Sequence, residues 1–362
     1  MLNNGLIALV LFVITLVASY AFVAKASSLF EKWGLVDRPG PTRVNPNIVA
    51  RGLGVAMYLA FLVGVGVSYS LPVERFPIET ERILLMVIGA AIVVAVMLVD
   101  DAISLPPTVR LIWQVVAAMM VIMPRFQGES RGIIIQQMDL PILGVTTFPL
   151  LLAVLGTVIW LVGMMNVMNW VDGLDGLAAS ISLVACSVMF IHTFWGFGGL
   201  PQFTISLLPL ILGAAIIGFL PFNWFPSKVI MGDAGAMFLG YALGVISLIG
   251  GAKIGMMLLV LGFPIMDGLW VTMNRIMNGQ SAMQRDNRHL HHRLLQAGFN
   301  QKQIVLIFSA ISGIFGAAAL LLPSQESKLL ALLVLGAVLL LILWWLARHP
   351  EKGIIDSSAP TS

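Results

Sequence analysis

The sequence predicts an all-α protein that crosses a membrane many times. Hydrophobic residues make up 59% of the 362 residues and charged residues only 10%, whereas charged residues form about a quarter of an ordinary soluble domain. The mean hydropathy is +0.98, and the apolar residues gather in runs close to the roughly 20 residues that a spanning helix needs. We therefore expect one integral-membrane domain over residues 1–348 and a short polar cytoplasmic tail over residues 349–362.

Eleven apolar runs qualify, or nearly qualify, as spanning helices. The first has no positive charge before it and several after it, so we expect it to be retained as a span and not cleaved as a signal peptide. In chain order the runs cover residues 5–24, 52–71, 82–99, 109–124, 147–165, 176–195, 203–220, 236–251, 254–274, 303–322 and 329–347.

The segments between the runs are short and differ in character. Residues 25–51 are basic and rich in Pro and Gly, and the Pro106-Pro107 break separates the third run from the fourth. Residues 125–147 hold two β-branched runs on either side of Asp139-Leu140-Pro141, a pattern that allows a small external β-hairpin. The last long segment, residues 279–301, carries a cluster of histidines.

Positive charge predicts the orientation, because loops on the cytoplasmic side carry an excess of Lys and Arg. With the N-terminus outside, the inner segments hold fourteen of the 20 Lys and Arg residues and the outer segments hold six. We therefore expect an N-out, C-in topology. The same bias accounts for the net charge of +3, so no nucleic-acid partner is required. The single cysteine, Cys186, excludes an intramolecular disulfide framework and a multi-cysteine metal site.

Under this topology four polar clusters share the cytoplasmic face. The first contains Asp100 and Asp101 at the end of the third run, followed by Arg110 at the start of the fourth. The two acids could cap a membrane helix at the water interface. However, adjacent carboxylates repel each other unless a cation lies near them. The alternative is therefore a functional site in which Arg110 meets a phosphate.

The second cluster is the run Asn166, Asn169, Asp172 and Asp175, which recur every three residues. On a regular helix this spacing turns each side chain back by about 60° and spreads the four over half the surface. Two Asp-Gly pairs provide the flexibility to fold them inward. One Asp-Gly pair would fit a surface turn, but two amides and two acids entering a span together favour a binding site.

The third cluster, residues 229–235 (VIMGDAG), places Asp233 directly before the eighth run. An N-cap is the ordinary role for such an acid, because it satisfies free backbone NH groups. The alternative is a phosphate or metal site, since the glycines permit close approach and a helix N-terminus favours anions. Asn223, a few residues earlier, remains an uncertain site residue.

The fourth cluster joins His289, His291 and His292 to Arg288 in a positively charged inner segment. A zinc site is one interpretation of the histidine spacing, although no cysteine or distant histidine pair completes a tetrahedron. A solvated basic loop is another. Arginine and histidine together more naturally bind the oxygens of phosphates and sugars.

Asp267 stands apart from these clusters. It lies about 12 Å deeper than Arg275 if the ninth run is one regular helix, because each residue rises 1.5 Å. An acid inside the membrane is a functional candidate by default. It could equally be the structural partner of a facing Asn or Arg.

Taken together, the motifs resemble a known enzyme family. NVMNWVDGLDGLA, VIMGDAG, LVDD and RDNRHLHHRL occur in the order and at the spacing typical of the polyprenyl-phosphate N-acetylhexosamine-1-phosphate transferases. Within this superfamily the chain is similar to the undecaprenyl-phosphate N-acetylglucosamine-1-phosphate transferases of the WecA and TagO type. The resemblance runs from about Gly34 to Phe299. It implies transfer of a sugar-1-phosphate from a UDP-sugar to undecaprenyl phosphate, release of UMP, and a Mg²⁺ ion, for which Mn²⁺ could substitute.

The resemblance also implies roles for individual residues. The positions that match metal ligands are Asp233 and Asn169, and those that match a base or a support for the metal are Asp100 and Asp101. Contacts to the lipid phosphate are implied for Arg110, and we expect Arg43 to join it. The nucleotide and sugar side comprises Asn166, Asp172, Asp175, Arg288, His289, His291 and His292.

Three positions depart from the pattern of the family. Relatives often carry His where this chain has Asn45, an aromatic residue where it has Ile230, and Ser where it has Ala236. Ile230 offers no aromatic ring on which uracil could stack. The histidine segment also lacks the MAPIHHH-like pattern of the muramyl-pentapeptide branch, which favours an unsubstituted amino sugar in the donor.

These expectations leave alternatives open. An ion-coupled transporter would explain Asp267, although transporters concentrate such groups near the midplane between repeats and we find no repeat. A noncatalytic lipid-phosphate binder, or a transferase of the same family that uses another UDP-N-acetylhexosamine, is a further possibility. For the enzyme we expect the bacterial cytoplasmic membrane, an active site facing the cytoplasm, contact with membrane lipid, and a homodimer.

Overall fold

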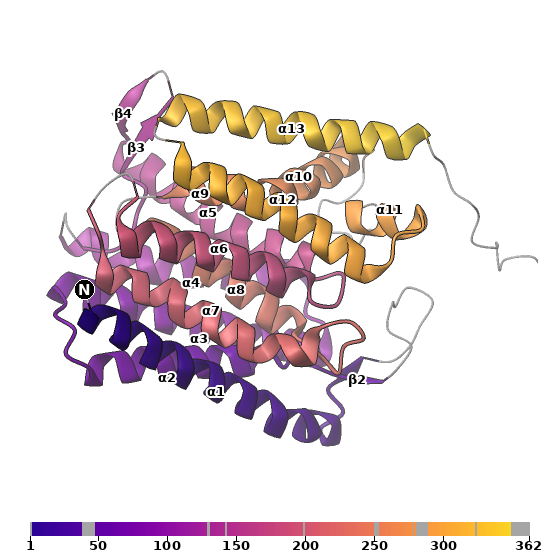
Figure 1. Ribbon diagram of the computed structural model, residues 1–362, viewed down its shortest axis with the longest axis horizontal. Helices are drawn as coiled ribbons and strands as arrows, with labels where there is room; N and C mark the ends of the chain where they lie inside the picture. Colours follow the sequence, from indigo (N-terminus) through magenta and orange to yellow (C-terminus); the bar gives the residue numbers. More distant parts are fainter. Residues whose placement is uncertain are drawn as a thin grey trace, which may run out of the picture.

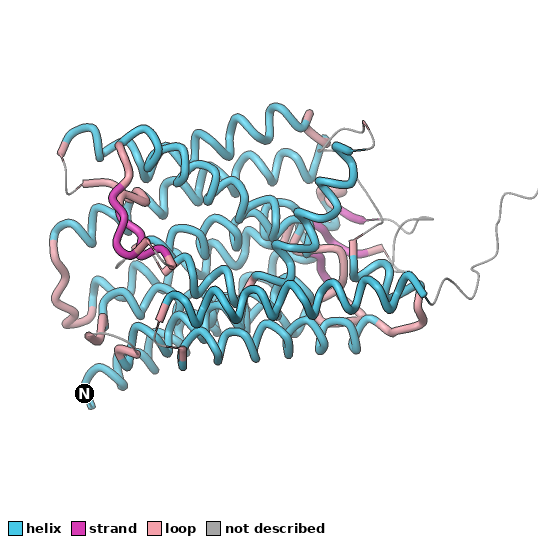
Figure 2. Tube along the Cα trace, turned by 90° about the horizontal axis from the view of Figure 1, so that it is seen from above, coloured by secondary structure: helices cyan, strands magenta, loops and turns pink. Residues whose placement is uncertain are grey.

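The computed structural model is a bundle of helices with two small sheets (Figure 1). It describes residues 2–37, 48–128, 131–141, 143–197, 200–249, 253–277, 279, 289–322 and 324–348. The long helices lie roughly along the longest axis. The β3–β4 hairpin lies at one end of the bundle, and β2 and α11 lie at the other (Figures 1 and 2).

The helices follow the apolar runs in chain order. The first seven are α1 (Leu2–Lys32), α2 (Gly54–Ser70), α3 (Pro77–Ile103), α4 (Pro107–Ile122), α5 (Leu150–Val171), α6 (Leu177–Trp195) and α7 (Phe203–Asn223). The others are α8 (Gly232–Leu248), α9 (Ile254–Val260), α10 (Gly262–Met277), α11 (Leu290–Gln296), α12 (Gln301–Leu321) and α13 (Gln325–Arg348), and a short 3₁₀ helix, η1, covers Met123–Gln127.

Within the described ranges, eight helices are long and apolar enough to cross a membrane, or nine if α9 and α10 form one bent span. Helices α2 and α8 are apolar but shorter. Each of the eleven predicted runs overlaps one of these helices or the bent pair. The chain is thus an all-α polytopic membrane protein.

The ninth predicted run, residues 254–274, is not one regular helix. It is broken after Leu261, and the axes of α9 and α10 differ by 78°. The break has a local cause: Pro264 has no NH group to continue the hydrogen bonds of α9, and proline favours the first turn of a new helix. Hydropathy alone does not detect this break.

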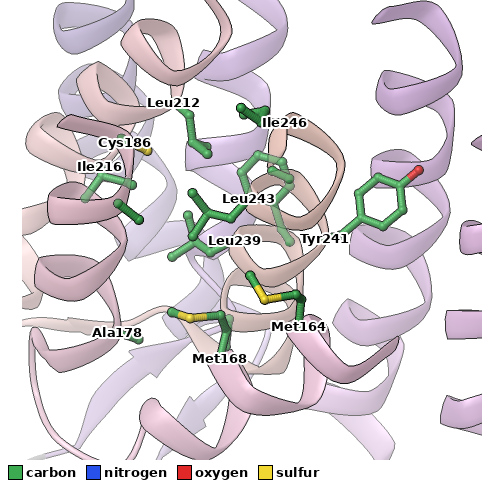
Figure 3. Packing of buried hydrophobic residues seen from close by; sticks show 14 of the residues in the cluster. Met164, Met168, Ala178, Cys186, Leu212, Ile216, Leu239, Tyr241, Leu243 and Ile246 are labelled. Carbon is green, nitrogen blue, oxygen red and sulfur yellow. The ribbon is translucent and has the colours of Figure 1, made fainter. Parts of the chain in front are cut away.

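Helix α8 forms the centre of the bundle, and every residue from Ala234 to Leu248 is buried. A side chain at Gly240 would overlap the backbone of Met164 in α5. Small residues of this kind let membrane helices approach closely. Figure 3 shows the packing around α8, with Leu239 and Leu243 near Met164 and Met168 of α5 and near Leu212 and Ile216 of α7.

A three-stranded sheet joins distant segments at one end of the bundle. Its order is β1 (Val36–Asp37), β2 (Val49–Arg51) and β5 (Val229–Ile230). The β1–β2 pair is antiparallel, and the β2–β5 pair is parallel with Arg51 opposite Ile230. The pairing continues as Gly54 N donates to Met231 O at 2.9 Å. This sheet therefore brings Arg51 beside the start of α8.

The predicted hairpin lies at the opposite end. It pairs β3 (Gln137–Leu140) with β4 (Gly144–Thr147) in antiparallel register. The hairpin is confirmed, but its turn lies slightly later than the predicted break at Asp139-Leu140-Pro141, because Asp139 and Leu140 belong to β3. Gly144 has φ +67°, a conformation that glycine adopts without strain, and it allows the turn to fall after Pro141.

Candidate functional site

The end of the bundle with β1, β2 and β5 collects charged side chains from five segments. Carboxylates come from the ends of α3 and α5 and from the start of α8, and guanidinium groups come from β2 and α4. Five of these residues were predicted: Asp100, Asp101, Asp172, Asp233 and Arg110. The sixth, Arg51, was not predicted as a site residue.

Asp101 anchors the start of α8. Its side chain has no exposed surface, and its oxygens accept from Asp233 N at 3.0 Å and Ala234 N at 3.2 Å. These NH groups belong to the first turn of α8, which has no internal partners for them. Gly232 has φ +70°, and a side chain there would overlap the Asp101 carboxylate. Asp101 therefore caps α8 from another helix.

Asp100 occupies a different position from its neighbour. One oxygen accepts from Leu105 N at 2.6 Å, and the other lies 3.4 Å from Arg110 Nη1. The pair thus meets separate cations, since Arg51 Nε lies 2.8 Å from Asp101. This explains how two adjacent carboxylates are tolerated at the membrane boundary.

Asp233 is not the N-cap of α8, so that interpretation was wrong. Its side chain bridges the two guanidinium groups instead, with Oδ1 at 3.1 Å from Arg51 Nη2 and Oδ2 at 3.3 Å from Arg110 Nη1. Arg51 also lies 3.9 Å from Asp37. Asp233 is therefore the residue that both arginines share.

Arg51 is the more enclosed of the two arginines, with 17% of its side chain exposed against 25% for Arg110. Burial alone would lower the pKa of its guanidinium. The nearby Asp101 and Asp233 outweigh burial and raise the pKa above its ordinary value. Arg51 therefore stays charged and acts as an internal counter-ion.

The acidic run after α5 approaches the same cluster. Asp172 follows the last residue of α5, and its pKa is raised well above the ordinary value, first by burial and then by the negative charge of Asp233 and Asp101, against the opposing effect of Arg51. Burial likewise raises the pKa of Asp175, which accepts from Ser227 N at 3.1 Å. Neither acid lies on a free surface turn.

Asn223 holds this loop to the sheet. Its amide oxygen accepts from Gly176 N at 3.2 Å, and its amide nitrogen donates to Val229 O at 3.0 Å. The side chain is buried. These contacts give Asn223 a structural role that joins the end of the acidic run to β5.

The two asparagines of α5 face different surroundings. Asn166 Nδ2 donates to Gln114 Oε1 at 2.9 Å and to Val162 O at 2.8 Å. Both amide hydrogens are therefore used within the bundle. Asn169 is half-buried and makes no side-chain hydrogen bond to the residues that the structure describes. It lies about one helical turn before Asp172, so its amide is the one available to a ligand.

The histidine segment packs against the end of α5 and is not a solvated loop. His289 and His291 are buried, and their ring planes are nearly parallel with centroids 5.8 Å apart. His292 lies next to His291, with centroids 4.3 Å apart. Asp267 meets this segment through both oxygens: Oδ2 lies 3.0 Å from His289 Nδ1, and Oδ1 accepts from Leu290 N at 3.0 Å.

Some predicted residues lie outside the described ranges, namely Arg43, Asn45, Arg288 and the tail 349–362. Of the three departures from the family pattern, two are described. Ile230 is half-buried in β5, and Ala236 is fully buried in α8.

No three His, Cys, Asp or Glu side chains in the described ranges converge in a way that could hold a metal ion. This removes support there for the zinc interpretation of the histidines. A Mg²⁺ ion has a smaller requirement, because it keeps water and phosphate oxygens beside one or two protein carboxylates. The cluster fits such an ion, since the carboxylates of Asp100, Asp101 and Asp233 outnumber the guanidinium groups of Arg51 and Arg110.

Comparison with known proteins gives a consistent picture. The model of glycosyl transferase family 4 matches residues 83–251, a range that holds the four clustered carboxylates but not the histidine segment. The chain is 31% identical to a probable undecaprenyl-phosphate N-acetylglucosaminyl 1-phosphate transferase of Bacillus subtilis, over 90% of this chain and 87% of that protein.

Two further relatives show how the similarity extends. A decaprenyl-phosphate N-acetylglucosaminephosphotransferase of Mycolicibacterium smegmatis is 29% identical over 83% of this chain and 79% of its own length. A phospho-N-acetylmuramoyl-pentapeptide-transferase of Staphylococcus saprophyticus is 33% identical, but over only 45% of this chain and 50% of its own length. The similarity to N-acetylglucosamine enzymes therefore covers more of the chain.

Proposed function

The chain belongs to glycosyl transferase family 4, and from this premise we propose that it transfers N-acetylglucosamine-1-phosphate from UDP-GlcNAc to undecaprenyl phosphate. The products are undecaprenyl-diphospho-GlcNAc and UMP. Such a lipid-linked sugar suits the first membrane step of a cell-envelope polysaccharide pathway. The relatives that match most of the chain support the sugar and the polyprenyl acceptor.

The observation that carries this proposal is the shared Asp233. Its carboxylate joins Arg51 and Arg110, and Asp100 and Asp101 lie on the other sides of the same two arginines. Phosphoryl transfer needs charge neutralisation and in-line positioning more than covalent chemistry. A cluster of fixed acids and arginines at one end of a membrane bundle meets that need for two phosphate-bearing substrates.

We propose that Asp233 and Asn169 hold a Mg²⁺ ion, with Mn²⁺ as a possible substitute. The excess of carboxylates favours a cation, and the Asn169 side chain makes no hydrogen bond to the residues that the structure describes. When bound, the ion would neutralise charge on the diphosphate of the donor. Asp172, Asp175 and the histidine segment then remain for the nucleotide and the sugar.

In the proposed reaction an oxygen of undecaprenyl phosphate forms a bond to the β-phosphorus of UDP-GlcNAc. The bond from that phosphorus to the bridging oxygen breaks, and UMP leaves with the electron pair. Arg110 binds the lipid phosphate, because its guanidinium is the more exposed of the two. The second pKa of a phosphate is about 6, so the nucleophile is already mostly dianionic, and Asp100 supports the charge distribution without acting as an obligatory base.

We further propose eleven spans, with α2, α8 and the bent α9–α10 pair included, in an N-out, C-in topology. This orientation faces the charged end toward the cytoplasm, where nucleotide sugars are found. The Lys and Arg distribution supports it. The setting is then a bacterial cytoplasmic membrane, and a homodimer remains a family-level proposal.

The transporter alternative loses its main support. It rested on an unexplained acid inside the membrane, but both oxygens of Asp267 contact the histidine segment, at His289 Nδ1 and Leu290 N. The other clustered acids lie at one end of the bundle and not near its middle. The choice between UDP-GlcNAc and another UDP-N-acetylhexosamine is a question for measurement.

The test is an assay of the purified protein with UDP-GlcNAc, undecaprenyl phosphate and Mg²⁺. We expect UMP and a lipid-linked sugar in equal amounts, and less product from UDP-GalNAc. Absence of UMP with every UDP-sugar tried would reject the enzyme. Supplying the donor without lipid and finding a covalent sugar-phosphate adduct on the protein would reject direct displacement.

A further inference from the structure

A buried carboxylate outside residues 83–251, the part that matches the family model, holds the histidine segment in place. Asp267 lies in α10 and is buried. Its Oδ2 lies 3.0 Å from His289 Nδ1, and its Oδ1 accepts from Leu290 N at 3.0 Å. A backbone NH can only donate, and an ionised carboxylate can only accept. Both oxygens of Asp267 are therefore committed to two consecutive residues.

This pairing selects one form of the His289 ring. Because Asp267 accepts, Nδ1 of His289 carries a hydrogen, and in the neutral ring Nε2 then has a free lone pair. The partner of one ring nitrogen sets the state of the other. Nε2 makes no hydrogen bond to the described residues. His289 therefore presents an acceptor, and not a donor, to whatever binds there.

Stacking fixes the direction of the same ring. His289 stacks with Trp170 of α5, at a centroid distance of 6.2 Å, and with His291, at 5.8 Å. Trp170 in turn lies directly on Gly268, where any side chain would overlap the indole. Asp267 thus contacts the edge of the His289 ring, and the neighbouring Gly268 leaves room for Trp170, which stacks with that ring.

The stack is continuous with the acidic cluster. Trp170 and Gly173 flank Asp172, and a side chain at Gly173 would overlap the His291 ring. Nε2 of His291 is buried and has no hydrogen-bond partner among the described residues. The orientation of the histidine rings is therefore coupled to the loop that carries Asp172.

We propose that Asp267 is a positioning residue that holds His289 in the form with hydrogen on Nδ1, so that Nε2 accepts a hydrogen bond from a hydroxyl or acetamido NH of the donor sugar. This inference rests on the proposed function for the identity of the sugar. It assigns the ring to a neutral part of the donor, since phosphate oxygens offer no hydrogen for Nε2 to accept.

The decisive variant is Asp267→Asn, which keeps the size of the side chain. The amide oxygen must turn toward Leu290 N, because that group only donates, and the amide NH₂ then faces His289 Nδ1. Nδ1 becomes an acceptor and the hydrogen moves to Nε2. The fold is retained while the ring presents the wrong atom. By analogy with the outer partners of metal-binding histidines, we expect the loss of this contact to cost about 10-fold to 100-fold.

We expect Asp267→Asn to lower kcat/KM for UDP-GlcNAc by that factor and to leave the KM for undecaprenyl phosphate within about twofold. His289→Ala removes the ring, so Asp267→Asn should cause no further loss in that background. Glu79→Gln is the matched control, because Glu79 also accepts from a backbone NH, that of Phe76, at the opposite end of α3. Near-normal kinetics of Asp267→Asn, or a full additional loss in the His289→Ala background, would overturn the proposal.

A second measurement does not depend on activity. Nitrogen-15 NMR of the ligand-free protein with labelled histidine reports which ring nitrogen carries the hydrogen, and His289→Gln identifies the signal. We expect hydrogen on Nδ1 in the natural protein and on Nε2 in Asp267→Asn. Hydrogen on Nε2, or on both nitrogens, in the natural protein would contradict the inference. If no UDP-sugar yields UMP, the proposed function fails while this measurement still decides the state of the ring.

Discussion

The site has two halves that are organised by different forces. The acid half consists of Asp100, Asp101, Asp233, Arg51 and Arg110, and its members are held by ion pairs between segments far apart in the chain. The histidine half consists of Asp267, Trp170, His289 and His291, and it is held mainly by stacked rings and one carboxylate.

The difference matches two tasks. Fixed charges balance the phosphates, whose charge changes during transfer, and they gain strength where water is excluded. Stacked rings with one defined hydrogen-bonding atom instead recognise a neutral group, such as a hydroxyl of the donor sugar. We therefore expect changes in the acid half to affect turnover and changes in the histidine half to affect recognition of the donor.

Asp233→Asn should break the acid half most severely. The amide cannot neutralise both guanidinium groups, and we expect the rate of UMP release to fall on the order of 100-fold or more. Asp139→Asn is the matched control, since Asp139 is exposed in the hairpin at the opposite end. If Asp233→Asn released UMP at a rate near that of the natural protein, Asp233 would not be a metal ligand and the acid half would not depend on it.

Replacing a glycine by alanine in each half adds only a methyl group and tests how tightly that half is packed. Gly232→Ala would strain a φ of +70° and press on Asp101, and Gly268→Ala would displace Trp170. Each should lower the free energy of unfolding, measured on the protein solubilised in detergent, by about 1–3 kcal/mol. Only Gly268→Ala should also raise the KM for UDP-GlcNAc selectively. Gly163→Ala is the control because nothing lies near it, and equal effects of all three changes would contradict the packing.

Substitution of the two arginines of the acid half should have different effects. Arg110→Lys keeps the charge but loses the forked geometry that suits phosphate, so the KM for undecaprenyl phosphate should rise by about 10-fold, which is about 1.4 kcal/mol. A lysine at position 51 cannot contact Asp101 and Asp233 at the same time. Arg51→Lys should therefore lower the unfolding temperature more than Arg110→Lys does. If Arg51→Lys raised the lipid KM more than Arg110→Lys, their roles would be reversed.

The smallest expected effect concerns acid stability of the histidine half. Burial, followed by the neighbouring His292 and His289, lowers the pKa of His291 well below its ordinary value. Unfolding lets this ring take up a proton, so its contribution to stability is present above the unfolded pKa of about 6.5 and declines as the pH falls below it. Between pH 7 and pH 5, the unfolding temperature of His291→Phe should fall less than that of the natural protein. An equal pH dependence in both proteins would exclude His291 as its source.

Much of the fold follows from composition, because apolar runs of spanning length have few alternatives in a membrane. The bend at Leu261 was missed, since a hydropathy average does not register that Pro264 lacks an NH group. The hairpin was expected, but its strands begin later than the β-branched run, because Ile133 and Ile135 are buried against the bundle.

For the site, the acids were found because four clusters of unusual polarity interrupt an apolar chain. Arg51 was missed because its partners, Asp101 and Asp233, come from other segments, and only the β2–β5 pairing brings them together. Asn166 was grouped with the nucleotide ligands, whereas its amide hydrogens bond Gln114 and Val162. Spacing along one helix does not indicate which neighbour a polar side chain will meet.

The parallel pairing of β2 with β5 also sets an order of assembly. Arg51 and Asp233 are separated by 182 positions, which at 5–20 residues per second corresponds to roughly 10–40 s of synthesis. Asp101 is made 132 positions before Asp233, so Arg51 and Asp101 are both present before the start of α8 is made. The charged end is thus completed only when the eighth helix arrives, and a chain interrupted before that point would expose Arg51 and Arg110, without the carboxylate that joins them, to the machinery that removes unfinished proteins.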